Sequence, residues 1–440
     1  MISTEYGKVE GIRKGGCTVY MGIPFAKPPV GELAFRHPVK PESWEGILKA
    51  DHGSKNPIQS QSKFACGNIS EDCLYLNVYV PDHEEGRTLP VMVWVYGGSF
   101  SHGGVGGKTE GSDILGYNLE KFAAATNCII VSFNYRLNLY GFLNLSFLDE
   151  RFDRNNGLYD QIMALHFVKD NIAAFGGDAE KITVFGQSAG AACILALMSM
   201  EETKGLFSQV IVQSACVEHF FTEEESHANT RLYMKKAGVS EPSQLLKLPL
   251  EQIMKANDEF ESAVLWKAEL RCAFSPVIDG ITLKQEPKLA AQAAEYPMLI
   301  GNTEHEGNLY VQNIPVIVMP ILSAILHLKP EKGEEPYWQR VSKAMTDAIF
   351  IKPQLEILEG YKGPAWRYQF CHNLEGSKLG TCHISELYFL FDSGKTIDEV
   401  EIPESDEAGR IMRKIWGDFA RNGNPGWESY RQQKYTENII

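Results

Sequence analysis

Apolar residues in this chain are grouped in short runs, and many of these runs are continuous rather than alternating. Continuous apolar runs are typical of strands in a sheet that is covered on both faces. The strands predicted in this way cover residues 74–80, 91–96, 129–135, 182–185, 210–213, 298–300 and 366–370. A polar and apolar alternation over residues 7–12 and 18–21 predicts a small hairpin before them.

Helical spacing of apolar residues appears between some of the predicted strands. Residues 158–175 are the clearest case, and an amphipathic helix is expected over 406–422, ended by Gly423. Strands that alternate with helices indicate an α/β fold with a mostly parallel sheet. We therefore expect a central sheet that helices cover on both faces.

Two stretches interrupt this alternation. Residues from about 217 to 295 and from about 315 to 362 are helix-prone and poor in strand signals. We expect one domain over 1–440, with these two segments as helical insertions that cover the active site as a lid. The apolar stretch 316–328 contains Pro320 and His327 and is short for a membrane span, so we interpret it as a buried or lid helix.

Composition is ordinary for a globular enzyme, with 44% hydrophobic and 22% charged residues among 440. The net charge of -14 argues against a nucleic-acid surface, which needs basic patches. The first residues lack the layout of a signal peptide, so we expect a cytoplasmic protein with no membrane span. Its nine cysteines are then expected to be reduced thiols. The sequence contains no C-x-x-C pair, so a structural zinc site is not expected. Nothing in the sequence indicates an oligomeric state.

The most informative local pattern is Gly186-Gln187-Ser188-Ala189-Gly190, which follows an apolar run and precedes small and apolar residues. A strand, then G-x-S-x-G, then a helix is the arrangement that exposes a nucleophilic serine at a tight turn. Glycines are needed where the turn passes close to a neighbouring chain. Ser188 is therefore the candidate nucleophile.

A serine hydroxyl needs a base to take its proton and a carboxylate to orient that base. In hydrolases with this kind of serine turn, the acid follows the serine in the chain and the histidine follows the acid. Candidate acids are Glu304 and Glu306, in the polar loop after the strand at 298–300. The candidate base is His383, with His305 and His372 as rivals.

Backbone N–H groups must stabilise the negative oxygen that forms when a serine attacks a carbonyl carbon. One is expected from Ala189, the residue after the nucleophile, and others from a glycine-rich loop after an earlier strand. Gly97, Gly98 and Ser99 follow the run at 91–96 and supply such a loop.

Several longer blocks match known proteins beyond these short patterns. They are residues 70–77 (SEDCLYLN), 93–100 (VWVYGGSF), 134–137 (NYRL) and the long serine block from 175 to 190. On these blocks the chain resembles the type-B carboxylesterases, which include bacterial para-nitrobenzyl esterases and the cholinesterases. The resemblance implies an α/β-hydrolase fold and a serine esterase that works through an acyl-enzyme without a cofactor.

The resemblance also implies a role for individual residues. Ser188 would be the nucleophile, Glu306 the acid and His383 the base. The oxyanion hole would comprise Gly98, Ser99 and Ala189. Around this centre, the family positions map to Gln187 beside the nucleophile, Ser214 behind the acid and Glu386 in the histidine segment.

The chain departs from the family at three places. Ser99 replaces a glycine of the cholinesterases, Gln187 replaces a common glutamate, and the loop between Cys66 and Cys73 is short and lacks the tryptophan that contacts choline. A cationic substrate would find neither a charge nor a cation–π contact. We therefore expect neutral esters with short-to-medium acyl or aryl groups.

Two alternatives stay open at this level. The same triad would serve a lactonase, a thioesterase or an amidase, because all of these proceed through an acyl-enzyme. A non-catalytic binding protein on this fold is disfavoured, because serine, acid and base are all present. Pocket walls are expected from both insertions, and the candidate aromatic residues are Phe220, Phe221, Phe260, Trp266 and Phe274.

Overall fold

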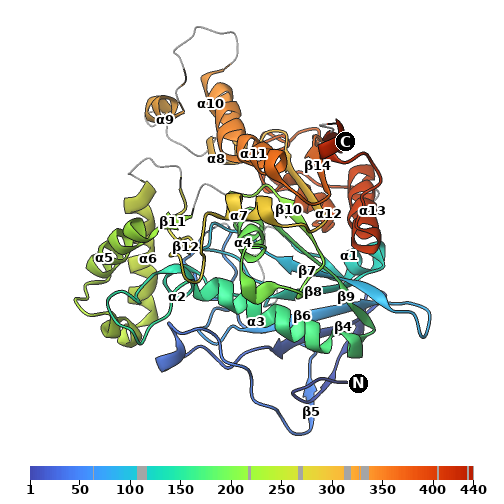
Figure 1. Cartoon of the computed structure of the whole chain (residues 1–440), viewed down its shortest axis with the longest axis horizontal. Helices are drawn as coiled ribbons and strands as arrows, with labels where there is room; N and C mark the ends of the chain where they lie inside the picture. The colour runs from blue at the N-terminus through green and yellow to red at the C-terminus, as the bar shows by residue number, and fades with distance from the viewer. Residues whose placement is uncertain are drawn as a thin grey trace.

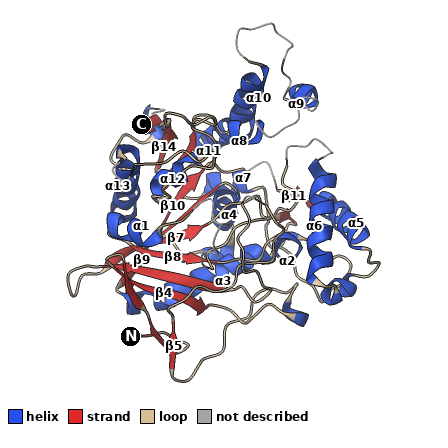
Figure 2. Cartoon of the chain, turned by 180° about the vertical axis from the view of Figure 1, so that it is seen from behind, coloured by secondary structure: helices blue, strands red, loops and turns tan. Residues whose placement is uncertain are grey.

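The structure, a computed structural model, has a ten-stranded mixed sheet at its centre (Figures 1 and 2). The structure describes residues 1–62, 64–106, 116–216, 220–265, 271–311, 319–326, 328, 336–403, 406–433 and 436–439. From one edge of the sheet to the other, the strands are β15 (Thr436–Ile439), β14 (Ala365–Phe370), β13 (Met298–Thr303), β10 (Gln209–Gln213), β9 (Gly177–Gln187), β7 (Leu89–Val95), β8 (Ile129–Phe133), β6 (Tyr75–Pro81), β4 (Cys17–Pro24) and β3 (Ile12–Lys14).

Most of this sheet is parallel, as the continuous apolar runs predict. Neighbours from β15 through to β8 run parallel, and β8, β6, β4 and β3 pair antiparallel. All seven predicted strands are present. The largest difference in length is at β9, which starts at Gly177 rather than near Ile182. Gly177 pairs with Leu89 of β7, the register then shifts, and the pairing resumes between Val91 and Ile182. The added residues are polar, and backbone pairing does not require apolar side chains.

An N-terminal hairpin is present, but residues 12–14 form its first strand in place of the predicted 7–12. β3 pairs with β4, with Ile12 opposite Val19, and the turn between them contains Gly15 and Gly16 at φ of 56° and 77°. Glycine adopts this left-handed conformation without a steric penalty. The segment at 8–10 instead forms β2 (Lys8–Glu10), in a separate sheet between β1 (Ile2–Ser3) and β5 (Ile47–Lys49).

Helices cover both faces of the large sheet (Figures 1 and 2). α3 (Asn156–Asn171) and α4 (Ala189–Leu197) pack on one face, and α1 (Leu119–Thr126) and α13 (Glu407–Asn422) pack on the other. The predicted helix over 406–422 is confirmed. Asp406 caps its start by accepting from Gly409 N at 3.2 Å, and Gly423 ends it at φ 66°.

The two segments expected as insertions are mainly helical. The first contains α5 (Glu223–Ala237), α6 (Leu250–Leu265), α7 (Pro287–Ala293) and the unpredicted short strands β11 (Phe221–Thr222) and β12 (Val277–Ile278). The second contains α9 (Met319–Ile325), α10 (Tyr337–Met345), a π-helical turn (Thr346–Ile351) and α11 (Lys352–Gly360). The remaining short helices are α2 (Asn138–Phe142), α8 (Asn308–Val311), α12 (Ser385–Leu390) and α14 (Tyr430–Gln433).

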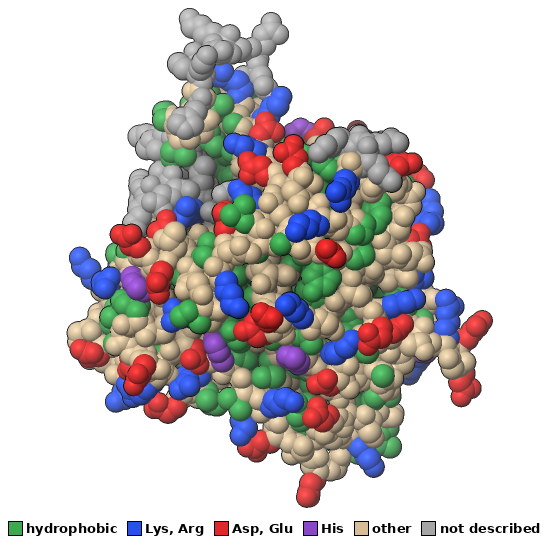
Figure 3. All heavy atoms as spheres, in the orientation of Figure 1, with side chains coloured by type: hydrophobic (Ala, Val, Ile, Leu, Met, Phe, Trp, Pro, Cys, Tyr) green, Lys and Arg blue, Asp and Glu red, His purple; other side chains and the backbone are tan. Residues whose placement is uncertain are grey.

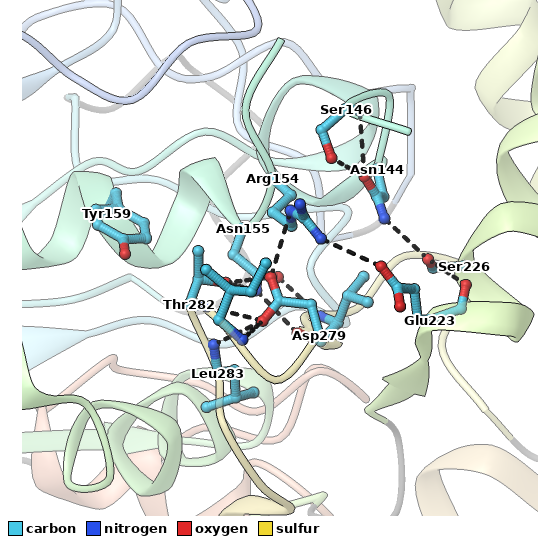
Figure 4. Close-up of polar contacts among 12 residues, drawn as sticks. Asn144, Ser146, Arg154, Asn155, Tyr159, Glu223, Ser226, Asp279, Thr282 and Leu283 are labelled. Carbon is cyan, nitrogen blue, oxygen red and sulfur yellow. Dashed lines mark hydrogen bonds and ion pairs between the residues drawn. The ribbon is translucent and has the colours of Figure 1, made fainter. Parts of the chain in front are cut away.

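A polar network joins the first helical segment to the loop before α3 (Figure 4). Arg154 reaches Glu223 at the start of α5 at 3.3 Å and the buried Asp279 at 3.4 Å. Asn155 donates to the carbonyl of Val277 at 2.9 Å and accepts from its N–H at 2.8 Å. These contacts attach both ends of the segment around α5 and α6 to the core domain.

The apolar core contains residues from Tyr6 to Ile439. In a smaller cluster, Val341 and Met345 of α10 pack with Val311. On the face shown in Figure 3, acidic and basic side chains are interspersed. The described residues include no helix long and apolar enough to cross a membrane. Within the apolar stretch 316–328, residues 319–325 form α9, and 316–318 and 327 lie outside the described residues.

Candidate active site

The serine turn has the strained geometry that its sequence predicts. Ser188 stands between the end of β9 and the start of α4 at φ 58° and ψ −124°, a conformation that L-residues rarely adopt. Its N–H donates to Gln213 O at 2.9 Å. A Cβ at Gly190 would lie 2.2 Å from Val95 O, and one at Gly186 would lie 2.5 Å from the same atom. Glycine is therefore required on both sides of the serine.

The loop after β7 lies directly against this turn. A Cβ at Gly97 would lie 3.0 Å from Ser188 Cβ, and Gly98 has φ 114° with no room for a side chain beside His102 O. Ser99 keeps its side chain at φ 56° and is exposed to the pocket. No described residue accepts a hydrogen bond from the N–H of Gly98 or Ser99. Ala189 is the first residue of α4, so its N–H has no acceptor within the helix.

The structure brings Glu306 and His383 together. His383 Nδ1 lies 2.5 Å from Glu306 Oε2. The other carboxylate oxygen accepts from Ser214 Oγ at 2.5 Å and from Thr303 N at 2.8 Å. Because Glu306 is fully buried, these donors replace the water that its negative charge would otherwise need.

The loops that carry the acid and the histidine are hydrogen-bonded to each other. His305 N donates to Thr381 O at 3.0 Å, and His383 N approaches Glu306 O at 3.4 Å. The rings of Tyr310 and Phe350 lie 5.4 and 5.0 Å from the His383 ring, between centroids. The imidazole is therefore held at Nδ1 and packs beside two tilted aromatic rings.

The serine and the histidine each have a different hydrogen-bonding partner in this structure. Gln187 Nε2 lies 3.1 Å from His383 Nε2, and Ser188 Oγ lies 3.9 Å from Cys216 Sγ. Burial raises the pKa of the Cys216 thiol well above its usual value, which keeps it uncharged. Catalytic hydrogen bonds often form only when substrate is bound, so this geometry is compatible with a triad.

A small pocket of about 80 Å³ opens onto Ser188 and His383. Its walls include Phe64, Cys66, Ser99, Tyr117, Leu309, Tyr310 and Ile384. No Asp, Glu, Lys or Arg is found in its described lining.

The aromatic residues expected as walls lie elsewhere. Phe220, Phe221, Phe260 and Phe274 are buried in the protein and absent from the described lining, because they pack around α5 and α6. Trp266 lies outside the described residues.

The rival acid and bases are placed away from the serine. Glu304 and His305 are about half exposed, lie 3.5 Å apart as a pair of their own, and line a separate hollow of about 680 Å³. His372 Nε2 contacts Asp406 Oδ2 at 3.1 Å, at the start of α13.

Glu386 lies close behind this centre without reaching the pocket. It is fully buried and its Oε2 accepts from Tyr368 Oη at 2.7 Å. Burial raises its pKa to about 8, and the nearby Glu306 charge adds to this effect.

Some contacts were not expected from the sequence. Cys216 follows the end of β10, where parallel strands direct residues toward one edge, and this position was the available signal. Tyr310 and Phe350 had no local signal, because each contacts His383 across more than thirty positions of sequence.

None of the described cysteines forms a disulfide bond, Cys66 and Cys73 included. Within the described ranges, no group of three or more His, Cys, Asp and Glu side chains is placed to hold a metal ion.

Known proteins resemble this chain over most of its length. The model of the carboxylesterase family matches residues 1–320. The para-nitrobenzyl esterase of Bacillus subtilis is 36% identical over 99% of this chain and 93% of its own length. A human cocaine esterase is 29% identical over 94% of this chain and 80% of its own length. A solved structure of a PNB esterase superposes with a TM-score of 0.85 at 33% identity, covering 100% of this chain and 95% of that one. The chain therefore belongs to the carboxylesterase family, has the α/β-hydrolase fold and is a carboxylesterase.

Proposed function

We propose that the protein hydrolyses carboxylic esters through an acyl-enzyme on Ser188, with His383 as general base and Glu306 as the acid that orients it. The observation that carries the proposal is the buried chain of hydrogen bonds from Ser214 through Glu306 to His383, next to the strained serine turn. A carboxylate at Nδ1 selects the histidine tautomer whose Nε2 can accept a proton.

In the first half of the reaction, Ser188 Oγ attacks the ester carbonyl carbon while its proton moves to His383 Nε2. The carbonyl oxygen becomes negative and accepts hydrogen bonds from the N–H groups of Gly98, Ser99 and Ala189. His383 then gives its proton to the departing alkoxide oxygen, so that the alcohol leaves and Ser188 carries the acyl group.

In the second half, water attacks the acyl carbon and gives its proton to the same Nε2 atom. The bond between the acyl carbon and Ser188 Oγ breaks, and His383 returns the proton to that oxygen. The carboxylic acid leaves, and the free enzyme is restored. Each step moves protons and electron pairs within the enzyme and substrate, and none requires a cofactor.

The pocket supports neutral esters with short acyl groups as substrates. Its described walls have no acidic or basic residue apart from the proposed base, so they offer no ion-pair partner to a charged substrate. Gln187 places a neutral amide where a negative charge would favour a cationic alcohol. A volume of about 80 Å³ leaves room for a short acyl chain.

The test of the triad is the hydrolysis of p-nitrophenyl acetate and covalent labelling by a fluorophosphonate. Ser188→Ala should abolish both, because the attacking oxygen is lost. Ser208→Ala is a matched control, since Ser208 donates to the Ile182 carbonyl in the middle of β9, away from the serine turn. Near-wild-type turnover by Ser188→Ala would contradict the proposal.

The substrate class is tested separately with p-nitrophenyl esters of increasing acyl length. We expect kcat/KM to be highest for acetyl and butanoyl esters and to decrease for longer chains. A maximum at long chains would contradict the short-acyl assignment and leave the triad intact.

A further inference from the structure

In this structure, the two atoms that must exchange a proton each contact another group. His383 Nε2 contacts the amide of Gln187 at 3.1 Å. Ser188 Oγ contacts Cys216 Sγ at 3.9 Å, and it has no described hydrogen bond to His383. Transfer of the serine proton requires Oγ and Nε2 to meet. Both contacts therefore have to be exchanged before an ester can react.

When Nδ1 carries the proton of a neutral histidine, Nε2 can accept a hydrogen bond from only one donor at a time. Nδ1–H donates to Glu306 Oε2, which leaves a single lone pair on Nε2 in the ring plane. The Gln187 amide N–H donates to this lone pair at 3.1 Å. The hydroxyl of Ser188 needs the same lone pair to become a nucleophile, so the two side chains compete for it.

We propose that Gln187 caps His383 Nε2, competes with Ser188 for that atom, and gives way to Ser188 when an ester enters. The inference rests on the proposed triad. A carboxamide suits this role because it is uncharged and has a donor on one side and an acceptor on the other. A glutamate at this position has no N–H to donate to neutral histidine, and its charge would favour the imidazolium.

The position of His383 does not depend on Gln187. Its Nδ1 is held by Glu306, and the rings of Tyr310 and Phe350 lie against it. Removal of the amide should therefore free Nε2 without displacing the imidazole.

Gln187→Met tests the competition, because methionine keeps the length of the side chain and removes both amide groups. Loss of one neutral hydrogen bond that competes with the serine should accelerate the reaction about fivefold, the equivalent of about 1 kcal/mol. We expect this increase in the rate constant for fluorophosphonate labelling and in kcat/KM for p-nitrophenyl acetate. A side chain with a purely structural role would leave these rates unchanged or lower them.

Gln187→Glu tests the contact through the pH profile. A carboxylate 3 Å from Nε2 holds a proton on the histidine, so the pKa that limits kcat/KM on its acidic side should rise by about one unit or more. Activity of this variant at pH 6 should then fall well below that of the wild type.

Gln209→Met is the matched control, since Gln209 is a buried glutamine that bonds Thr183, Phe419 and Ala420 at the far end of β10. It should lower Tm and leave labelling and the pH profile unchanged. Wild-type or slower labelling of Gln187→Met would overturn the proposal, as would a pKa in Gln187→Glu that stays within about 0.3 units of the wild type. Failure of the triad would be distinct, because Ser188→Ala would then still be labelled.

Discussion

Glu386 is buried beside the proposed triad. It allows a quantitative test of how strongly burial disfavours a negative charge there. The carboxyl group is fully buried, accepts from Tyr368 Oη at 2.7 Å, and its Oε1 has no hydrogen-bond partner among the described residues. Burial is the largest cause of its perturbation, and the Glu306 charge acts in the same direction. The hydrogen bond from Tyr368 opposes them in part, and the net effect raises the pKa of Glu386 from 4.5 to about 8.

This pKa makes stability depend on pH with a definite sign. Between about pH 4.5 and pH 8, the unfolded chain releases the proton while the folded protein keeps it, so rising pH favours unfolding. The contribution of Glu386 is fully present below pH 4.5 and is lost as the pH rises through 8. At about 1.36 kcal/mol per pH unit, the total loss over this window is about 5 kcal/mol.

Glu386→Gln removes the titration and keeps the shape of the side chain. Its free energy of unfolding, relative to the wild type, should increase by about 3–5 kcal/mol between pH 5 and pH 8.5. Urea unfolding followed by tryptophan fluorescence, with refolding checked at each pH, measures this difference. Glu150→Gln is the control, because Glu150 is exposed and its replacement should give a constant difference. A constant difference for Glu386→Gln would refute the reasoning, because it would mean that the carboxyl is ionised in the folded protein throughout.

Two further substitutions test the buried charges. Ser214→Ala removes a donor to Glu306 at 2.5 Å, and kcat/KM for p-nitrophenyl acetate should fall about 10- to 100-fold, the range for a hydrogen bond to a charged group. Threonine at this position should restore most of the activity, and an unaltered rate for the alanine variant would show that Ser214 does not position the acid. Arg136→Met leaves Asp160 buried without the guanidinium that now bonds it at 2.6 and 2.8 Å, which should destabilise the protein by about 3–5 kcal/mol in urea unfolding. Adding Asp160→Asn should recover much of this loss, and a change below about 1 kcal/mol would contradict the assignment.

The order of strands and helices could be predicted from local patterns. Buried parallel strands need apolar side chains on both faces, so they appear as continuous runs, and α13 ends where Gly423 adopts a left-handed conformation. The N-terminal hairpin was predicted with the wrong partner, because residues 8–10 and 12–14 have similar alternation. Their choice of partner depends on β5, which comes more than thirty residues later.

The part of the candidate site that could be predicted from local sequence is the serine turn, because its geometry restricts which residues fit there. The serine turn requires Gly186 and Gly190, because any side chain there would meet Val95 O. The preference for Glu306 over Glu304 came from resemblance to a family. In the structure the side chain of Glu306 is buried and contacts His383, whereas the side chain of Glu304 is exposed.

The sequence by itself determined the elements, their order and the identity of the candidate reacting groups, because apolar periodicity and tight turns are properties of a few neighbouring residues. Only the tertiary structure decided which of these groups face one another. Gln187 meets His383 across 196 positions of sequence, and Ser188 meets Cys216 across 28. Such contacts follow from the order of β9, β10, β13 and β14 in the sheet, whose carboxyl ends direct distant loops to one edge.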